Sequence, residues 1–255
     1  MFEYANDRDR FKGFKAQAKR APVQSFWTLT LEVGVAIHAR DKDKIKSWSD
    51  LAGKRVFTGP PPWDVRAQLE RALETAGVKH EYVQVDLQTV SSQLESGQLS
   101  GFIIYTSAET GTAPWITEAS LGTDWAALNP SAAELEKLKK AGFSTFEATD
   151  KQFNRKIHVD KATLFPFFYG FHVGLEVPAD DVYRMLVTIE KNLDELVTVD
   201  KGSFAQLKAG MPEMQRRGVA SSVEFVPVHP GLARYMKERK VWDSKWDGRI
   251  ASATN

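Results

Sequence analysis

Short apolar segments alternate with helical patterns between residues 54 and 105, and this alternation constrains the fold more than any other feature. The helical pattern at 64–76 is the clearest, because its apolar residues share one face and Gly77 follows as a stop signal. The pattern predicts strands at 55–58, 81–85 and 99–105 and helices at 64–76 and 89–95. Such an order is typical of a doubly wound α/β unit with a parallel sheet, whose ligands bind at the carboxyl ends of the strands.

The first strand end is followed by Gly59 and three prolines, and a helix is predicted to begin near Asp64, which can cap it. A helix N-terminus offers free N–H groups and a positive dipole end, which suit an anion. Prolines have no N–H and weaken such a cradle. We expect Trp63 to form an aromatic wall and Arg66 to pair with a carboxylate. The alternative is a rigid loop with a surface arginine.

The second strand end carries Tyr105, Thr106 and Ser107, which are candidate hydroxyl donors to a ligand. The alternative is a buried tyrosine followed by a solvated turn. Tyr169 lies in an aromatic run at 165–169 and is the candidate there, with core packing as the alternative for the phenylalanines.

The rest of the chain is strand-rich before this unit and helical after it. The patterns predict a strand end and loop at 2–20, one or two strands at 25–39, and a helix at 131–141 that Ser131 caps, with Glu134 at the reciprocal capping position. They also predict a loop-like stretch at 145–168, a strand at 171–177, the longest helix at 178–199, and helices at 203–211 and 229–238. We therefore expect an α/β fold in two lobes, with mixed or parallel sheets flanked by helices. Lobe 1 would comprise 1–47 and 161–255, lobe 2 would comprise 48–160, and the ligand would bind between them.

Composition excludes several function classes. The 255 residues include no cysteine, which excludes thiolate catalysis and Cys-ligated zinc, and a net charge of +1 gives no sign of a nucleic-acid surface. No apolar run is long enough for membrane insertion. The five histidines lack metal-ligand spacing, so no metal site is expected, and no nucleophile elbow, phosphate loop or dinucleotide motif indicates catalysis or a cofactor.

Four phrases, in order along the chain, resemble a known family. They are IKSWSDLAGKRVFTG at 45–59, SSQLESGQLSGFIIYTSAETGTAPWITEAS at 91–120, VPADDVYRMLVTIEKNLDEL at 177–196 and VPVHPGLARYMKERKVW at 226–242. They are similar to phrases of the periplasmic solute-binding proteins of TRAP transporters, specifically the TAXI family. The chain departs from that family in the prolines after Gly59, in Ser100-Gly101 where the family tends to have Asp-Ala, and in its opening.

The resemblance implies a periplasmic-binding-protein-like fold of type II and a non-catalytic receptor. Such a receptor captures a small organic anion, such as an amino acid or carboxylate, and delivers it to TRAP transporter membrane subunits. The implied location is the periplasm. Residues 1–8 lack the apolar segment of a signal peptide, and the family's opening strand–helix units have no counterpart, so we expect lobe 1 to be incomplete at its N-terminus.

Two alternatives remain open. One is an enzyme on a two-lobed α/β scaffold that acts on a small aromatic or pyrimidine-like compound, which would need His38 or His172 near an acid. The other is a fragment that binds no ligand.

Overall fold

The strand–helix alternation predicted for residues 54–105 is present in the computed structural model, which describes residues 1–18 and 22–252. Its contacts divide the chain into two compact units: unit 1 is Met1–Leu29 with Phe168–Asn255, and unit 2 is Thr30–Phe167. Two strands, β1 (Val23–His38) and β8 (Ala162–Val173), run from one unit into the other. The lobe boundaries expected from the sequence, 1–47 with 161–255 and 48–160, stay a prediction.

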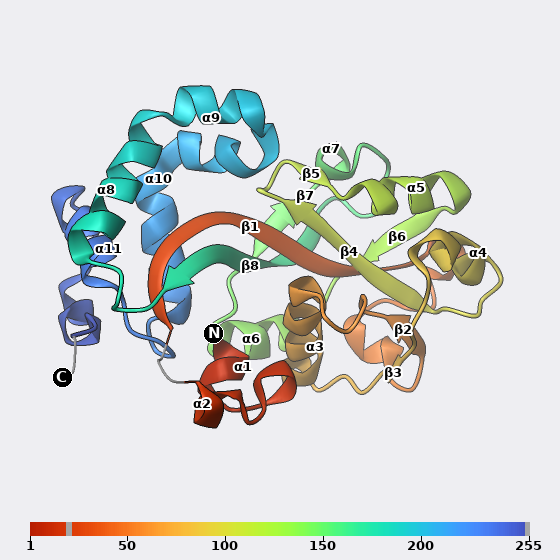
Figure 1. Ribbon diagram of the computed structural model, residues 1–255. Coiled ribbons are helices and arrows are strands. Elements are labelled where there is room, and N and C mark those ends of the chain that lie inside the picture. The colour runs from red at the N-terminus through yellow and green to blue at the C-terminus, as the bar shows by residue number, and fades with distance from the viewer. Residues whose placement is uncertain (19–21, 253–255) are drawn as a thin grey trace. The chain divides into compact units, whose positions relative to one another are not determined.

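Unit 2 contains the sheet and the short helices around it (Figure 1). Besides β1 and β8 its strands are β2 (Arg55–Phe57), β3 (Glu81–Tyr82), β4 (Gly101–Ser107), β5 (Gly111–Thr112), β6 (Trp125–Leu128) and β7 (Phe146–Ala148). Its α-helices are α3 (Asp64–Ala76), α4 (Val90–Glu95), α5 (Pro114–Gly122), α6 (Ala132–Lys140) and α7 (Asp150–Phe153), and its 3-10 helices are η2 (Ala39–Asp41), η3 (Trp48–Leu51) and η4 (Leu87–Thr89).

The sheet is mixed, with strand order β3-β2-β4-β1-β8-β7, while β5 pairs with β4 and β6 with β1. Strand β2 is parallel to both β3 and β4, as the alternation predicted. Strand β1 is antiparallel to β4 and β6, and β7 is antiparallel to β8. The predicted α/β class, with a mixed sheet flanked by helices, is confirmed.

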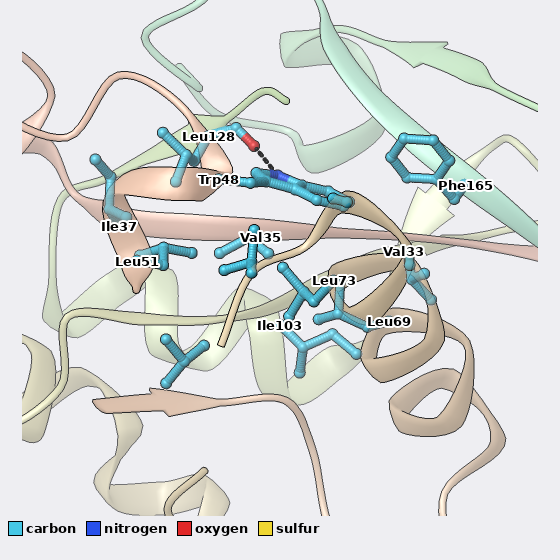
Figure 2. Close-up of a cluster of buried hydrophobic side chains, with 14 of the residues drawn as sticks. Val33, Val35, Ile37, Trp48, Leu51, Leu69, Leu73, Ile103, Leu128 and Phe165 are labelled. Carbon is cyan, nitrogen blue, oxygen red and sulfur yellow. Dashed lines mark hydrogen bonds between the residues drawn. The ribbon is translucent and has the colours of Figure 1, made fainter. Parts of the chain in front are cut away.

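Alternate residues of the central strands point to opposite faces of the sheet and build two cores in unit 2. On one face Trp48 is fully buried, donates from Nε1 to the Leu128 carbonyl at 2.9 Å, and lies against Phe165 with ring centroids 5.2 Å apart (Figure 2). Helix α3 covers this face with Leu69 and Leu73. The core of the other face includes Ala36, Phe57, Phe102, Ile104 and Trp125.

Unit 1 contains the helices at both ends of the chain. They are α1 (Phe2–Ala5), η1 (Asp9–Phe11), α2 (Phe14–Gln17), α8 (Ala179–Lys191), α9 (Leu193–Val199), α10 (Lys201–Ser222), α11 (Pro230–Glu238) and η5 (Ser244–Arg249). Figure 1 shows α8 to α11 lying together, in cyan and blue.

Trp27 lies at the centre of the core of unit 1. Its backbone N–H donates to Gln215 Oε1 at 2.9 Å, and Gln215 Nε2 donates to the Trp27 carbonyl at 2.8 Å. A Cβ at Gly170 or Gly218 would lie within 3 Å of the Trp27 ring, at 2.8 Å and 2.2 Å respectively. The indole therefore fits only because both positions are glycine.

Several predicted elements are confirmed in detail. Helix α3 spans 64–76 as predicted, and Gly77 ends it in the left-handed conformation with a φ of 88°. Ser131 and Glu134 form the expected capping box of α6. His229 caps α11, which begins at Pro230.

Other predictions were wrong, and each error has a local cause. The described part of 2–20 forms short helices, because its aromatic side chains pack on one another and on Phe225. The predicted helix 178–199 is interrupted at Asn192, so α10 is longer, although its backbone is non-helical at Gly210. The stretch 145–168 is not a loop, since β7, α7 and the first part of β8 lie in it. Across the described residues, no helix has the length and apolarity needed to span a membrane.

We predict that Gly218→Ala destabilises the protein by about 1–3 kcal/mol, the usual cost of an overpacked core. Alanine favours a helix over glycine by about 1 kcal/mol, so a loss of stability here reports the clash with Trp27 rather than helix propensity. Denaturant unfolding would measure the change. Gly248→Ala is the control, because a Cβ there meets nothing within 4 Å. Equal stabilities of both variants would contradict the prediction.

Candidate functional site

The parallel pairing of β2 and β4 brings the two predicted ligand segments to the same edge of the sheet. Phe57 is paired with Phe102, and both strands run toward the edge where residues 58–63 follow β2 and where β4 ends with residues 105–107. This edge therefore carries Gly59, Trp63 and Arg66 from one segment and Tyr105, Thr106 and Ser107 from the other.

Gly59 forms the tight turn between β2 and α3. Its φ is 107°, a conformation that favours glycine, and an added Cβ would lie 3.4 Å from Arg66 Cβ and 3.7 Å from the Trp63 ring. Its carbonyl accepts a hydrogen bond from the Tyr82 hydroxyl at 3.1 Å. The turn is thus fixed against the first turn of α3.

Trp63, rather than Asp64, occupies the N-cap position of α3, and no side chain caps this helix. The prediction that Asp64 caps it was wrong, because the Trp63 N–H bonds back to the Pro60 carbonyl and Asp64 is already helical. The Trp63 ring lies 6.3 Å from the ring of Trp115, at the start of α5.

Arg66 lies one turn from the start of α3, where its guanidinium stacks 4.2 Å from the centre of the Tyr82 ring. One of its terminal nitrogens is 3.7 Å from Glu70 Oε1, a long ion pair. Within the part of the chain that the structure describes, Arg66 Nε is buried and has no hydrogen-bond partner. The Arg66 side chain is 25% exposed, so its terminal N–H groups, and not the buried Nε, are the donors left for a further anion.

Glu70 is anchored by other groups than Arg66. It accepts a hydrogen bond from Thr58 Oγ1, and His80 Nε2 lies 3.3 Å from Glu70 Oε1. Burial alone would raise the pKa of Glu70, but the contacts with His80 and Thr58 and the charge of Arg66 hold it below its usual value. Glu70, His80 and Tyr82 escaped the sequence analysis, since no local motif marks them.

Tyr105 and Ser107 alternate with Thr106 along β4, so they lie on the opposite face of the strand from it. Tyr105 Oη accepts a hydrogen bond from Trp115 Nε1 at 3.0 Å, and its own proton is left for another acceptor. Burial raises the pKa of Tyr105, although the bond from Trp115 opposes this, so the phenol stays protonated. Trp115 was missed by the sequence analysis, because no local motif marks it.

Thr106 is fully buried and donates its hydroxyl proton to Glu32 Oε2 at 2.5 Å. Glu32, on β1, is itself fully buried and also accepts from the Glu109 backbone N–H at 3.1 Å. Burial raises the pKa of Glu32 despite these hydrogen bonds. The predicted contact of Thr106 with a ligand stays a prediction. Its hydroxyl proton is already used in the hydrogen bond to Glu32.

The turn from β4 to β5 has two consecutive residues in the left-handed region, Ala108 and Glu109, with φ of 54° and 62°. Such conformations cost energy outside glycine and persist only where neighbours hold them. Here the Ala108 N–H bonds to the Thr30 carbonyl at 2.7 Å, and Glu109 N–H bonds to Glu32. Glu32 therefore fixes the end of β4 that carries Ser107.

Tyr169, the remaining candidate ligand residue, belongs to unit 1. Its side chain is 40% exposed, and its ring is 6.0 Å from that of Phe171, which is 59% exposed. The Tyr169 carbonyl accepts from Thr28 Oγ1 at 3.0 Å. Its predicted role in ligand binding stays a prediction.

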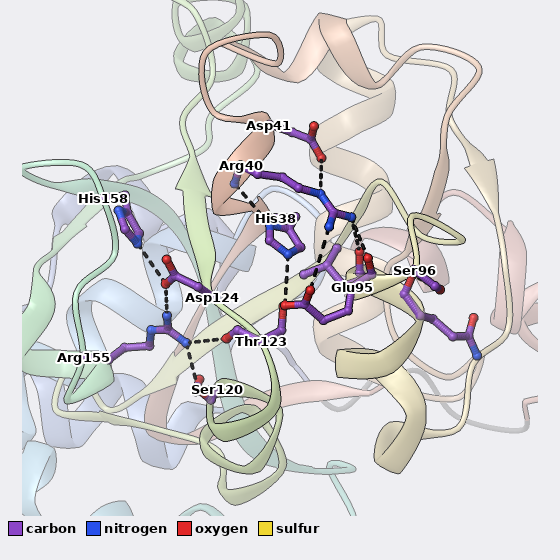
Figure 3. A network of polar contacts seen from close by, with 12 residues as sticks. His38, Arg40, Asp41, Glu95, Ser96, Ser120, Thr123, Asp124, Arg155 and His158 are labelled. Atoms are coloured by element: carbon purple, nitrogen blue, oxygen red, sulfur yellow. Dashed lines mark hydrogen bonds and ion pairs between the residues drawn. The ribbon is translucent and has the colours of Figure 1, made fainter.

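A second polar group in unit 2 surrounds His38, at the far end of β1 (Figure 3). His38 Nε2 lies 3.0 Å from Glu95 Oε1, which also accepts from Thr123 Oγ1 at 2.7 Å. Nearby, Asp124 Oδ1 bonds to Arg155 at 2.6 Å and to His158 at 2.9 Å. His158 also borders an open hollow of about 490 Å³ that is lined by Lys42, Thr149, Asp150, Lys156, His158, Val159 and Asp160. Over residues 1–18 and 22–252, no three His, Cys, Asp or Glu residues are grouped as a metal site.

The model of the NMT1-like family matches residues 6–239, so the chain belongs to the NMT1-like family. No curated protein matches the chain. Eighteen chains of solved structures do. One of them is the periplasmic aliphatic sulphonate binding protein SsuA from Escherichia coli, with 16% identity over 98% of this chain and 82% of that one and a TM-score of 0.42. The narrower resemblance to TAXI receptors stays a prediction.

We predict that Glu32→Gln becomes more stable relative to the natural protein as the pH rises. Folding raises the pKa of Glu32 above its usual 4.5. The stability that protonated Glu32 contributes to the natural protein is therefore fully present below pH 4.5 and is lost as the pH rises through the folded-state pKa. Glutamine keeps an oxygen acceptor without the charge. Glu32→Ala should cost about 1–3 kcal/mol at every pH, because Thr106 and Glu109 lose their acceptor.

Denaturant unfolding from about pH 4 to about pH 8 would measure both effects. Glu118→Gln, at an exposed position on α5, is the matched control. A stability difference between Glu32→Gln and the natural protein that does not change with pH would refute the role given to the buried charge.

Proposed function

We propose that this chain is a solute-binding protein that captures a small organic anion, such as an amino acid or another carboxylate, and serves a TRAP-type transporter in the periplasm. The observation that carries the proposal is the position of Arg66 and the weakness of its contacts within the protein. This cation lies at the carboxyl ends of β2 and β4, where α/β sheets bind ligands, its side chain is 25% exposed, and its ion pair with Glu70 is long at 3.7 Å.

Further groups at the same edge support an anion site. The first N–H groups of α3 have no acceptor within the helix, and the positive end of its dipole faces the Gly59 turn. Tyr105 has a hydroxyl proton to donate. Together with Arg66, these donors match the two oxygens of a carboxylate.

The transporter, the location and the type of receptor come from the sequence resemblance. Its four phrases keep the order of the TAXI family from residue 45 to 242, and three of the candidate ligand residues, Tyr105, Thr106 and Ser107, lie inside one of them. The proposal includes closure of two lobes around the ligand, in which Tyr169 would take part.

The alternative, an enzyme, would need His38 or His172 near an acid, and the contacts of these two histidines give it little support. His38 does face an acid, Glu95, but its Nδ1 accepts the Arg40 backbone N–H at 3.1 Å, so its proton is on Nε2 and no lone pair is left to act as a base. Because Ala36 pairs with Phe102 and Leu31 with Ser107, His38 also lies at the opposite edge of the sheet from Ser107. Burial lowers the pKa of His172 to about 4, and its Nδ1 accepts from the Ser25 backbone.

We predict that an organic anion stabilises the purified protein and that Arg66→Met weakens its binding about ten- to hundredfold. This range corresponds to the loss of a hydrogen bond to a charged group, about 1.5–3 kcal/mol. A panel of amino acids and carboxylates, screened by thermal unfolding, would find the ligand, because a ligand held only by the folded state raises the midpoint. Calorimetric titration would then give the affinities.

Arg184→Met, at an exposed position on α8 of unit 1, is the matched control and should bind like the natural protein. Arg66→Lys should retain part of the affinity, since it keeps the charge but loses the planar guanidinium. A protein that unfolds cooperatively and responds to no anion would overturn the proposal, and so would an Arg66→Met variant with unchanged affinity.

A further inference from the structure

We propose that the ligand of this site is a monoanion that carries a planar ring, such as an aromatic monocarboxylate. This inference rests on the proposed function and adds the chemical class of the ligand. It comes from three aromatic side chains at the same edge of the sheet as Arg66, only one of which, Trp63, was expected to form a wall.

Trp63, Trp115 and Tyr105 form a continuous row. The ring centroids of Trp63 and Trp115 are 6.3 Å apart, and those of Tyr105 and Trp115 are 6.1 Å apart. All three side chains are only partly buried, so part of each is open to solvent. Partly exposed aromatic side chains gathered at one spot favour a binding surface, because each offers a rigid contact area.

The row is supported from beneath by completely buried rings. Trp115 lies 6.4 Å from Phe57 and 6.3 Å from Phe102, and both phenylalanines have no exposed area. The hydrogen bond from Trp115 Nε1 to Tyr105 Oη adds a polar restraint. The core is therefore complete without the exposed parts of Trp63 and Trp115, which remain as a preorganised surface for stacking.

The side chain of Arg66 begins next to this surface. Its Cβ and the Trp63 ring lie 3.4 Å and 3.7 Å from the Cβ position of Gly59, and its guanidinium extends to the Tyr82 ring. A ligand with a ring and one carboxylate can thus place the ring on the aromatic row and the carboxylate at the guanidinium. An aliphatic acid of similar size would make the same contact with the guanidinium, but its contact with the aromatic row would be weaker.

The neighbouring Glu70 favours a single negative charge on the ligand. Glu70 Oε1 is 3.7 Å from a terminal nitrogen of Arg66 and its pKa is lowered, so it adds negative charge close to the cation. A second carboxylate on the ligand would be repelled by it. This separates the proposed class from dicarboxylates.

The test compares matched acids by calorimetric titration of the full chain: benzoate and phenylacetate, then hexanoate and cyclohexanecarboxylate, then phthalate. We expect the natural protein to bind the aromatic monoacids about tenfold more tightly than the aliphatic ones, on the scale of one aromatic contact, and phthalate more weakly. Trp63→Leu should bring the aromatic and aliphatic affinities to within about twofold of each other. Trp242→Phe, in unit 1, is the control and should keep the preference.

Each outcome separates this inference from the proposed function. Aliphatic acids that bind as tightly as aromatic ones would refute the inference that the ligand carries an aromatic ring, but they would still support the proposed receptor function. A preference for aromatic acids that survives in Trp63→Leu would overturn the role of the aromatic row. If none of these acids nor any other anion binds the natural protein, both proposals fail. Far-UV circular dichroism and the unfolding midpoint of each variant would show that lost preference does not come from lost folding.

Discussion

The parallel pairing of β2 with β4 is the constraint on which the candidate site depends. It places the Gly59 turn and the end of β4 at one edge of the sheet, although nearly fifty residues of chain lie between them. The pairing is held by packing on both faces, because Val56 and Ile103 enter one core while Phe57 and Phe102 enter the other. The positions of Trp63, Arg66 and Tyr105 follow from this pairing.

Two carboxylates lie behind this edge, the partly buried Glu70 and the fully buried Glu32, and they differ in how their charge is compensated. Glu70 has His80, Thr58 and Arg66 around it, and its pKa is lowered. Glu32 is surrounded by neutral hydrogen-bond donors, the Thr106 and Thr30 hydroxyls and the Glu109 backbone, and burial raises its pKa. A buried charge without a cation is costly, so Glu32 costs folding free energy when it is ionised, while it holds the strained turn after β4 in place.

The sequence predicted those features that depend on neighbours along the chain. The bounds of α3, its stop at Gly77 and the capping box of Ser131 are decided within a few residues, and all were predicted. Contacts between distant segments were not. Glu32 and Thr106 are 74 residues apart, and the role of each depends on a strand register that no local pattern encodes. The partners of Arg66 were missed in part for the same reason, since Tyr82 reaches it from another strand.

The contacts of Arg66 decide whether it can serve a ligand at all. An arginine that neutralised Glu70 alone would be tied to it, because freeing a buried carboxylate of its only partner is costly. Here Glu70 also has His80 at 3.3 Å and the Thr58 hydroxyl, while Arg66 stands off at 3.7 Å and rests on the Tyr82 ring. An incoming anion can therefore take the guanidinium donors without leaving Glu70 unpaired. The stacking on Tyr82 meanwhile keeps the guanidinium in position, which lowers the entropy lost on binding.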